Sequence, residues 1–161
     1  MERKSFMIEV NIPGRRKYQI ENIVFDYNGT IALDGEMSIE TINNIKELSK
    51  LVKIYILTAD TYGTVTAKCH GLPVKLITFP SDNAAVYKRN LVESLKGDTI
   101  CFGNGFNDIE MFKVSTISVC IMGEEGCSGK LITLSDIVVS SIHDGFELLF
   151  KTDRIKATLR G

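Results

Sequence analysis

The sequence has no long apolar run. Stretches such as Ile54 to Leu57 and Ile137 to Val139 are far shorter than the ~20 apolar residues that a helix needs to cross a bilayer. The opening Met-Glu-Arg-Lys-Ser is followed by no apolar stretch of signal-peptide length. We therefore expect no membrane-spanning segment and a cytoplasmic protein.

A surplus of positive charge is also absent. The chain has 19 Lys+Arg against 20 Asp+Glu, for a formal net charge of −1. Proteins that bind nucleic acid usually carry a basic surplus, so this balance argues against such a partner. The basic run Arg15 to Lys17 is interpreted as a solvated turn.

The cysteines and histidines do not form a metal-binding pattern. The four cysteines contain no C-x-x-C, and Cys101 and Cys120 lie inside apolar runs, which predicts reduced structural thiols rather than disulfides or a zinc site. The two histidines, His70 and His143, have no second His or Cys placed as a metal partner.

Nucleotide-binding motifs are missing as well. Gly103-x-Gly105 is followed by Asp108 where a dinucleotide fingerprint needs a third glycine. Gly129-Lys130 lacks both the earlier glycine and the following Ser or Thr of a P-loop. Neither motif therefore predicts a nucleotide site.

What the sequence does have is a regular alternation of apolar strands and amphipathic helices. Its 161 residues suit one domain, 1–161, with no linker or repeat. The alternation predicts a doubly wound α/β fold, in which a parallel sheet carries helices on both faces. The expected strands are Ile23 to Phe25, Lys53 to Leu57, Lys75 to Phe79, Thr99 to Phe102, Ile117 to Ile121 and Ile137 to Val139. The first expected helix is capped by Ser38 and has Ile42, Ile45, Leu48 and Leu51 on one side. The other expected helices are one after Thr58 that ends near Gly71, one from about Asp82 to Leu95, one after Asn107, one near Lys130, and one from about Asp144 to Phe150.

A small β-hairpin is expected before the first core strand, within residues 1–20. Asn11 to Gly14 is turn chemistry between two short apolar stretches, Phe6 to Val10 and Tyr18 to Ile20. The second stretch is predicted to end before the core strand begins.

Polar residues follow three of the core strands directly. They are Asp26-Tyr27-Asn28-Gly29-Thr30, Thr58-Ala59-Asp60 and Gly103-Asn104-Gly105-Phe106-Asn107-Asp108. In doubly wound folds, ligands bind beyond the carboxyl ends of the strands. A carboxylate can form an aspartyl-phosphate, a threonine hydroxyl can hold a phosphoryl oxygen, and Gly-rich turns present N–H groups to anions. Together these residue types predict a phosphate-handling site.

This set resembles the haloacid dehalogenase (HAD) superfamily, and the match spans nearly the whole chain. Leu57-Thr58-Ala59-Asp60 is similar to the Leu-Thr-Gly-Asp of P-type ATPases, and Gly105-Phe106-Asn107-Asp108 to their Gly-x-Asn-Asp. Lys88 to Leu95 fits their Lys-x-x-x-Val-x-x-Leu without a gap. More narrowly, the chain resembles the soluble P-type-ATPase-like group of that superfamily.

The resemblance implies a role for each matching residue. Asp26 would be the nucleophile, and Thr58 and Lys88 would hold the phosphoryl oxygens. Phosphate contacts would also come from Tyr27, Asn28 and Ala59. A magnesium ion, Mg²⁺, would be held by Asp26, the Asn28 carbonyl and Asp108, with Asn104 supplying a neutral oxygen.

The sequence departs from the HAD pattern at two positions, Asn28 and Asn104, where most relatives have an acid. Asn28 stands in the place of the general acid and base and cannot shuttle a proton. General acid–base catalysis contributes about 10²- to 10⁴-fold, so its loss predicts slow turnover rather than an inert site. A neutral Asn104 predicts weaker metal binding, although one or two carboxylates with substrate phosphate can suffice for magnesium.

The short stretches between the motifs leave no room for a cap domain. The site should therefore be open to solvent, and we expect a homo-oligomer whose neighbouring subunit approaches the rim formed by the Asn28 to Asp34 loop and the segment after Thr58. An open site alone would admit water freely.

The sequence favours a magnesium-dependent phosphohydrolase or phosphotransferase that acts on an unidentified phosphorylated substrate through phospho-Asp26. Two alternatives stay open. One is a catalytically weak or inactive module that keeps the fold and binds phosphate or a protein partner. The other is a phospho-switch, in which phosphorylation of Asp26 alters assembly.

Overall fold

A single seven-stranded sheet runs through the molecule. The computed structural model describes residues 6–60 and 63–161. The strands lie in the order β4-β3-β2-β5-β6-β7, and β1 pairs antiparallel with β2 outside this path. All other pairs are parallel, which confirms the predicted α/β class. The strands are β1 (Ile8–Asn11), β2 (Lys17–Asp26), β3 (Lys53–Thr58), β4 (Lys75–Thr78), β5 (Asp98–Gly103), β6 (Ile117–Ile121) and β7 (Ile137–Val139).

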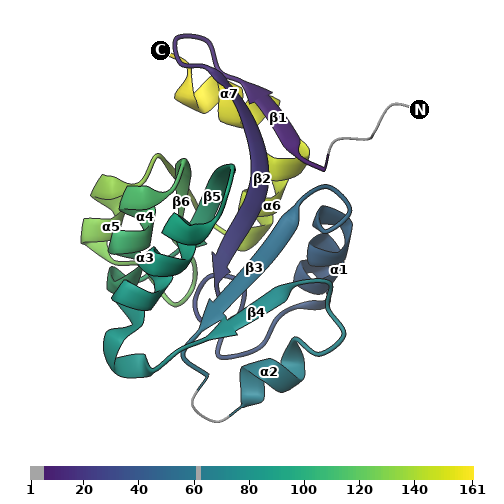
Figure 1. Cartoon of the computed structure of the whole chain (residues 1–161), viewed down its shortest axis with the longest axis vertical. Helices are drawn as coiled ribbons and strands as arrows, with labels where there is room; N and C mark the ends of the chain where they lie inside the picture. The colour runs from purple at the N-terminus through teal and green to yellow at the C-terminus, as the bar shows by residue number, and fades with distance from the viewer. Residues whose placement is uncertain (1–5, 61–62) are drawn as a thin grey trace.

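Helices cover both faces of this sheet, as the sequence predicts. In Figure 1, α3, α4 and α5 stack on one side, and α1, α6 and α7 lie on the other. The helices are α1 (Ile39–Leu48), α2 (Thr64–Lys68), α3 (Ala84–Ser94), α4 (Ile109–Val114), α5 (Gly129–Leu134), α6 (Ile142–Phe150) and α7 (Asp153–Leu159), with 3-10 turns at Ser81–Asn83 and Phe106–Asp108. No helix among the described residues is long and apolar enough to cross a membrane.

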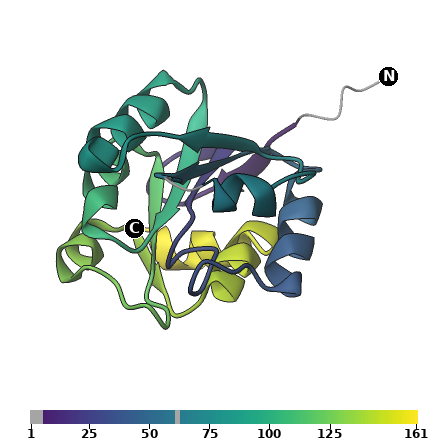
Figure 2. The same ribbon diagram turned by 90° about the horizontal axis from the view of Figure 1, so that it is seen from below.

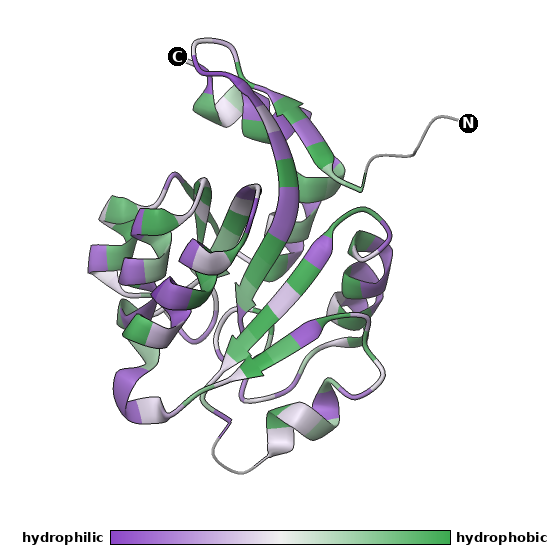
Figure 3. Ribbon diagram, in the orientation of Figure 1, coloured by the Kyte–Doolittle hydropathy of each residue, from purple (hydrophilic) through white to green (hydrophobic). Residues whose placement is uncertain are grey.

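Two apolar cores form because neighbouring side chains on a strand point to opposite faces. On β2, Phe25 belongs to the core beneath α1 and α6, whereas Val24 belongs to the core beneath α3, α4 and α5. Both side chains are fully buried. Figure 3 shows the strands as largely hydrophobic ribbons, while polar residues mark the outer faces of the helices. The cysteines at 69, 101, 120 and 127 are free, and the first three are buried.

The β1–β2 hairpin differs from the prediction in one respect. β2 is one continuous strand of 10 residues, so the predicted separation of a hairpin strand from the core strand is wrong. No glycine or proline interrupts it, and the irregularity appears instead as a register shift against β5 between Ile20 and Asn22. At this bulge, the Asn22 Nδ2 donates a hydrogen bond to the Lys96 carbonyl at 2.8 Å.

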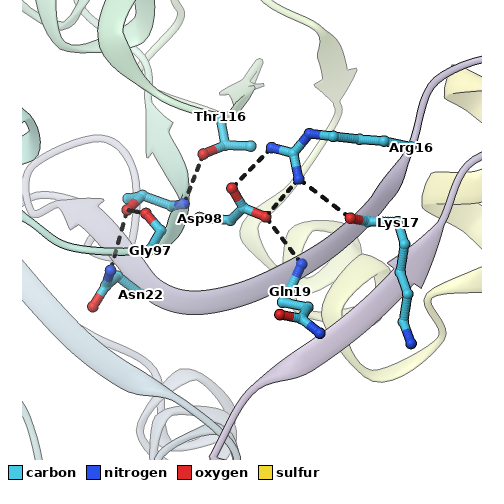
Figure 4. A network of polar contacts seen from close by, with 8 residues as sticks. Arg16, Lys17, Gln19, Asn22, Gly97, Asp98 and Thr116 are labelled. Carbon is cyan, nitrogen blue, oxygen red and sulfur yellow. Dashed lines mark hydrogen bonds and ion pairs between the residues drawn. The ribbon is translucent and has the colours of Figure 1, made fainter.

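The hairpin is attached to the start of β5 by a polar network. Arg16 donates two hydrogen bonds of 2.9 Å to the carboxylate of Asp98, which also accepts from the Gln19 amide at 3.0 Å (Figure 4). The guanidinium of Arg16 also lies over the Tyr18 ring, 4.0 Å from its centroid. Arg16 is exposed at the hairpin turn, as the sequence predicts, and it also ties the hairpin to β5.

The helix α1 begins where the sequence predicts and ends earlier. The Ser38 hydroxyl caps it by accepting a hydrogen bond from the Thr41 amide at 3.0 Å. Its residues Ile45 and Leu48 are fully buried. Leu51 was expected on the same side, but it lies beyond the helix end and is 36% exposed.

A C-terminal helix, α7, is absent from the sequence-based expectation. Ile155 and Leu159, which are four residues apart, give it a buried face, but only these two positions carry the periodic signal. The tertiary structure stabilises its end, because the Gly161 amide donates to the Pro13 carbonyl at 3.1 Å. The C-terminus consequently lies beside the hairpin tip (Figure 1).

Candidate active site

The polar strand ends meet at one edge of the sheet, as predicted. β2 pairs with β3 so that Asp26 lies beside Leu57, one residue before Thr58. On its other side β2 pairs with β5, which places Phe25 beside Phe102, one residue before Gly103. Figure 2 looks from below onto the carboxyl ends of these strands, where the loop after β2 crosses the sheet edge.

A buried lysine on α3 joins two of these strand ends. Lys88 Nζ donates to Asp26 Oδ1 at 3.0 Å and to Asp108 Oδ1 at 2.8 Å. Its side chain is 3% exposed. Burial alone would lower the pKa of Lys88, but the carboxylates of Asp26 and Asp108 outweigh it and raise that pKa. Lys88 is therefore held as a cation between two acids.

Asp26 is a carboxylate in an unfavourable place for a negative charge. It is 9% exposed at the end of β2. Burial and the nearby Asp108 charge raise the pKa of Asp26 to about 7, against the opposing effect of Lys88. Carboxyl groups whose pKa is shifted by burial and a specific charged neighbour are common at functional sites.

Asp108 is held rigidly from the other side. It is fully buried, and its Oδ2 accepts hydrogen bonds from the backbone amides of Asn104 at 3.1 Å and Gly105 at 3.0 Å. Gly103 makes this approach possible, because a Cβ there would lie 2.5 Å from Asp108 Oδ2. The turn after β5 thus fixes the orientation of the carboxylate.

Asn104 joins the loop after β2 to the loop after β6. Its Oδ1 accepts from the Thr30 hydroxyl at 3.3 Å, and its Nδ2 donates to the Gly126 carbonyl at 3.2 Å. Gly29 has a left-handed φ of 77°, and a Cβ there would meet Asn104 Nδ2 at 2.2 Å. The glycine of Asp-Tyr-Asn-Gly-Thr is therefore required by both backbone and packing.

Asn107 is a site residue that the sequence reasoning missed. The sequence places it directly before an expected helix, where Asn is a common cap, whereas its Oδ1 accepts a hydrogen bond from Lys88 Nζ at 2.9 Å. The cap position of α4 is occupied by Asp108 instead. The available signal was its place next to Asp108 in the Gly-Phe-Asn-Asp run.

The remaining predicted residues surround this centre with different exposures. Thr58 is buried at the end of β3, Ala59 is partly exposed, and Asn28 is exposed. The Tyr27 ring is buried, its hydroxyl donates to the Gly35 carbonyl at 2.8 Å, and its amide donates to the Leu57 carbonyl at 3.2 Å, so both of its hydrogen-bond donors already have partners within the chain. Residues 61–62 of the predicted rim after Thr58 lie outside the described residues.

The donor chemistry at this edge suits a hard divalent cation. Two carboxylates, Asp26 and Asp108, both contact the Lys88 ammonium, and burial together with the Asp108 charge raises the pKa of Asp26. Magnesium is usually bound by one or two carboxylates together with substrate phosphate. Asp26 and Asp108 are therefore carboxylates of the kind that hold such an ion, and Asn28, two residues after Asp26, is exposed.

Two sequence comparisons relate this chain to known proteins. The family model of haloacid dehalogenase-like hydrolases matches residues 83–140, which include Lys88, Asn104 and Asp108. An uncharacterized protein from Methanocaldococcus jannaschii is 39% identical over 80 residues, which cover 47% of this chain and 86% of that protein. The chain belongs to the haloacid dehalogenase superfamily.

Solved structures show the same fold at low sequence identity. The cobalt-bound deoxy-D-mannose-octulosonate 8-phosphate phosphatase of Haemophilus influenzae superposes with a TM-score of 0.69 at 13% identity, covering 88% of this chain and 94% of that one. The corresponding Moraxella catarrhalis phosphatase, in complex with magnesium, phosphate and KDO, has a TM-score of 0.68 at 15% identity with the same coverages. This chain therefore has the fold of the HAD phosphatases.

Proposed function

We propose that the protein is a magnesium-dependent phosphohydrolase or phosphotransferase that works through an aspartyl-phosphate on Asp26. The observation that carries the proposal is the buried contact of Lys88 with both Asp26 and Asp108 at the carboxyl edge of the sheet. Such a cluster provides a carboxylate nucleophile and a fixed cation for phosphoryl oxygens, which is what phosphoryl transfer requires.

Each residue of the site has a separate role in the proposed reaction. Asp26 would attack phosphorus, and Lys88 and Thr58 would stabilise the charge that develops on the phosphoryl oxygens. Asn107 and Asp108 keep the Lys88 ammonium in place through hydrogen bonds of 2.9 and 2.8 Å. Magnesium, held by Asp26, Asp108 and the Asn28 carbonyl, with Asn104 as a further oxygen, would neutralise charge on the phosphoryl group.

Asn28 determines how fast we expect the phospho-enzyme to be hydrolysed. It is exposed beside the nucleophile and has no titratable group, so it cannot protonate a leaving group or deprotonate water. The resemblance to the soluble P-type-ATPase-like group supports a phospho-enzyme that is hydrolysed slowly.

A phosphodonor experiment tests the proposal. The protein is incubated with magnesium and acetyl phosphate while covalent mass gain and released phosphate are followed together. We expect a mass gain of one phosphoryl group that disappears in Asp26→Asn and in excess chelator. Phosphate binding without covalent gain or release across a broad donor panel would favour the binding-module alternative.

We also propose that a second copy of the chain covers the open rim next to Asn28. The loop after β2 exposes Leu33, whose side chain is 43% accessible. An apolar side chain at the edge of a water-sensitive site is suited to burial against a partner. Sedimentation equilibrium should show a dimer or larger assembly, and a monomer at high concentration would refute this.

A further inference from the structure

One end of the sheet is an open strand edge. β7 is the last strand in the strand order and, among the described residues, pairs with β6 alone. The Val139 carbonyl accepts from the Met122 amide at 2.8 Å and therefore faces β6. Since the N–H and C=O of one residue point to one side of a strand and those of the next residue to the other side, both backbone groups of Val138 face away from the sheet. They are placed to pair with a further strand.

The strand at the other end of this order, β4, has features that discourage such pairing. It begins with the exposed Lys75 and lies between two prolines, Pro73 and Pro80. Lysine and proline at an edge strand hinder the addition of another strand. The three residues of β7, Ile137–Val139, include neither, and Val138 is 40% exposed. One edge is therefore protected by its sequence, and the other is apolar and open.

A groove of about 640 Å³ lies beside β7, between this strand and the helices α6 and α7. We call it the edge groove. On the strand side it is lined by Val138 and by Met122, which is 51% exposed. On the helix side it is lined by Leu148 of α6 and by the exposed Ala157 and Thr158 of α7. Because the α7 residues are small, another chain can approach the apolar floor closely.

The charged residues that line the edge groove have opposite signs. They are Asp144 of α6 and Arg154 of α7. The Arg154 side chain is 50% exposed, and its nearest carboxylate, that of Glu147, lies 3.9 Å away. Asp144 accepts a hydrogen bond of 2.9 Å from the Ser140 hydroxyl, and a carboxylate has about four acceptor positions. Both groups can therefore take a further charged partner.

A second copy of the chain offers the surface that matches this edge. Two identical strands that pair antiparallel are related by a two-fold axis, so an axis at Val138 lets the backbone groups of the two Val138 residues bond to each other. Each copy also brings one Asp144 and one Arg154. Their opposite charges can pair twice across the axis, which makes the edge groove complementary to itself.

We propose that β7 and the edge groove form the interface of a symmetric dimer, in which two sheets join through antiparallel β7 strands. Because β7 has only three residues, strand pairing supplies few hydrogen bonds, and the apolar groove and the Asp144–Arg154 pairs supply the rest of the affinity. The interface includes neither Asp26 nor the rim next to Asn28. The inference therefore goes beyond the proposed function and does not depend on it.

The first test places a charge at the centre of the interface. Val138→Lys brings two ammonium groups together at the two-fold axis, at a position that is already exposed in the single chain. The matched control is Val86→Lys, because Val86 is 47% exposed on α3 and does not line the edge groove. Sedimentation over a concentration series measures assembly, and circular dichroism checks the fold. We expect Val138→Lys to raise the dimer dissociation constant about tenfold or more and Val86→Lys to leave it unchanged.

The second test exchanges the charges of the edge groove. Asp144→Arg and Arg154→Asp each place like charges opposite one another, so each should raise the dissociation constant about tenfold. The double variant restores opposite charges with their signs exchanged and should return to within about threefold of the wild type. Recovery in the double variant also separates loss of charge pairing from loss of the fold.

Several outcomes would overturn the inference. A wild type that stays monomeric at high concentration would leave the edge to a strand of another protein and refute the dimer. Equal weakening by Val138→Lys and Val86→Lys would refute it too, as would a double variant weaker than both single variants. Leu33→Ser distinguishes this interface from the rim contact. Assembly that is lost in Leu33→Ser and kept in Val138→Lys would belong to the rim, and the β7 interface would be wrong whatever the phosphodonor experiment gives.

Discussion

Two charged networks in this protein have nearly the same contact distances and opposite physical characters. At the carboxyl edge of the sheet, Lys88 contacts Asp26 at 3.0 Å across 62 residues of sequence. At the start of β5, Arg16 contacts Asp98 at 2.9 Å across 82 residues. The side chains of the first pair are 3% and 13% exposed, and those of the second 52% and 20%.

The two aspartates respond to these surroundings in opposite directions. Burial and Asp108 raise the pKa of Asp26, whereas the hydrogen bonds from Arg16 hold the pKa of Asp98 below its usual range. An exposed carboxylate gains from its partner without losing much hydration, while a buried one loses hydration that a single cation does not fully replace. The buried network is therefore suited to chemistry and the exposed one to fastening the hairpin.

The contrast between the two networks is tested most strongly by replacing the aspartate of each network with asparagine. Asp26→Asn should abolish phospho-enzyme formation from acetyl phosphate, because the amide is not a nucleophile. Its free energy of unfolding should stay level or rise, because burial disfavours the Asp26 charge. Mass spectrometry and urea denaturation measure the two effects. Asp98→Asn, the matched control, should still form the phospho-enzyme; if it does not, the division between the networks is wrong.

Removing the buried cation should cost stability. Lys88→Met leaves Asp26 and Asp108 without their ammonium partner, and breaking a buried charge pair costs about 3–5 kcal/mol. Urea unfolding at neutral pH would measure the loss. The control is Lys17→Met, which removes an exposed contact of 3.3 Å to Glu9 and should cost about 1 kcal/mol or less. Equal losses in the two variants would contradict the assignment of Lys88 to a strongly coupled site.

Restoring a proton shuttle at position 28 should speed the proposed reaction at the buried network. Asn28→Asp is nearly isosteric at an exposed position, so it should disturb packing little. Where dephosphorylation limits turnover, hydrolysis of phospho-Asp26 should accelerate by about 10²- to 10⁴-fold. Single-turnover measurements with acetyl phosphate would follow the phospho-enzyme and free phosphate together. A wild type that already hydrolyses as fast as the variant would mean that another group supplies the base.

The smallest expected effect concerns the pH dependence of the exposed network. Because the pKa of Asp98 is lowered in the folded state, its contribution is complete above the unfolded value of about 3.9 and is lost as pH falls through the folded value. Asp98→Asn should therefore cost about 1 kcal/mol or less near pH 7, given the exposure of Arg16. That difference should shrink below about pH 4 in urea titrations, and a difference that grows there would contradict the sign.

Much of the fold could be predicted from the sequence because the patterns that indicate its strands and helix caps are local. The run Ile117 to Ile121 coincides with β6, which is buried along its whole length, since a strand buried on both faces is mostly apolar. The run Ile137 to Val139 coincides with β7 at the edge of the sheet, where Val138 is 40% exposed. The Ser38 cap was readable for the same reason, because it acts within three residues. The join of the hairpin to the core strand was not readable, since the bulge between Ile20 and Asn22 depends on pairing with distant β5.

The sequence alone determined which residue types stand at the strand ends, and with them the position of the candidate nucleophile Asp26. Only the tertiary structure decided how those groups interact: that Asn107 joins Asp26 and Asp108 around Lys88, that Asn104 bridges Thr30 and Gly126, and that a cavity opens beside Gly29. The physical reason is the distance along the sequence over which each kind of interaction acts. Strand and cap preferences act over a few residues, whereas burial, pKa shifts and cavities depend on which distant segments exclude water together.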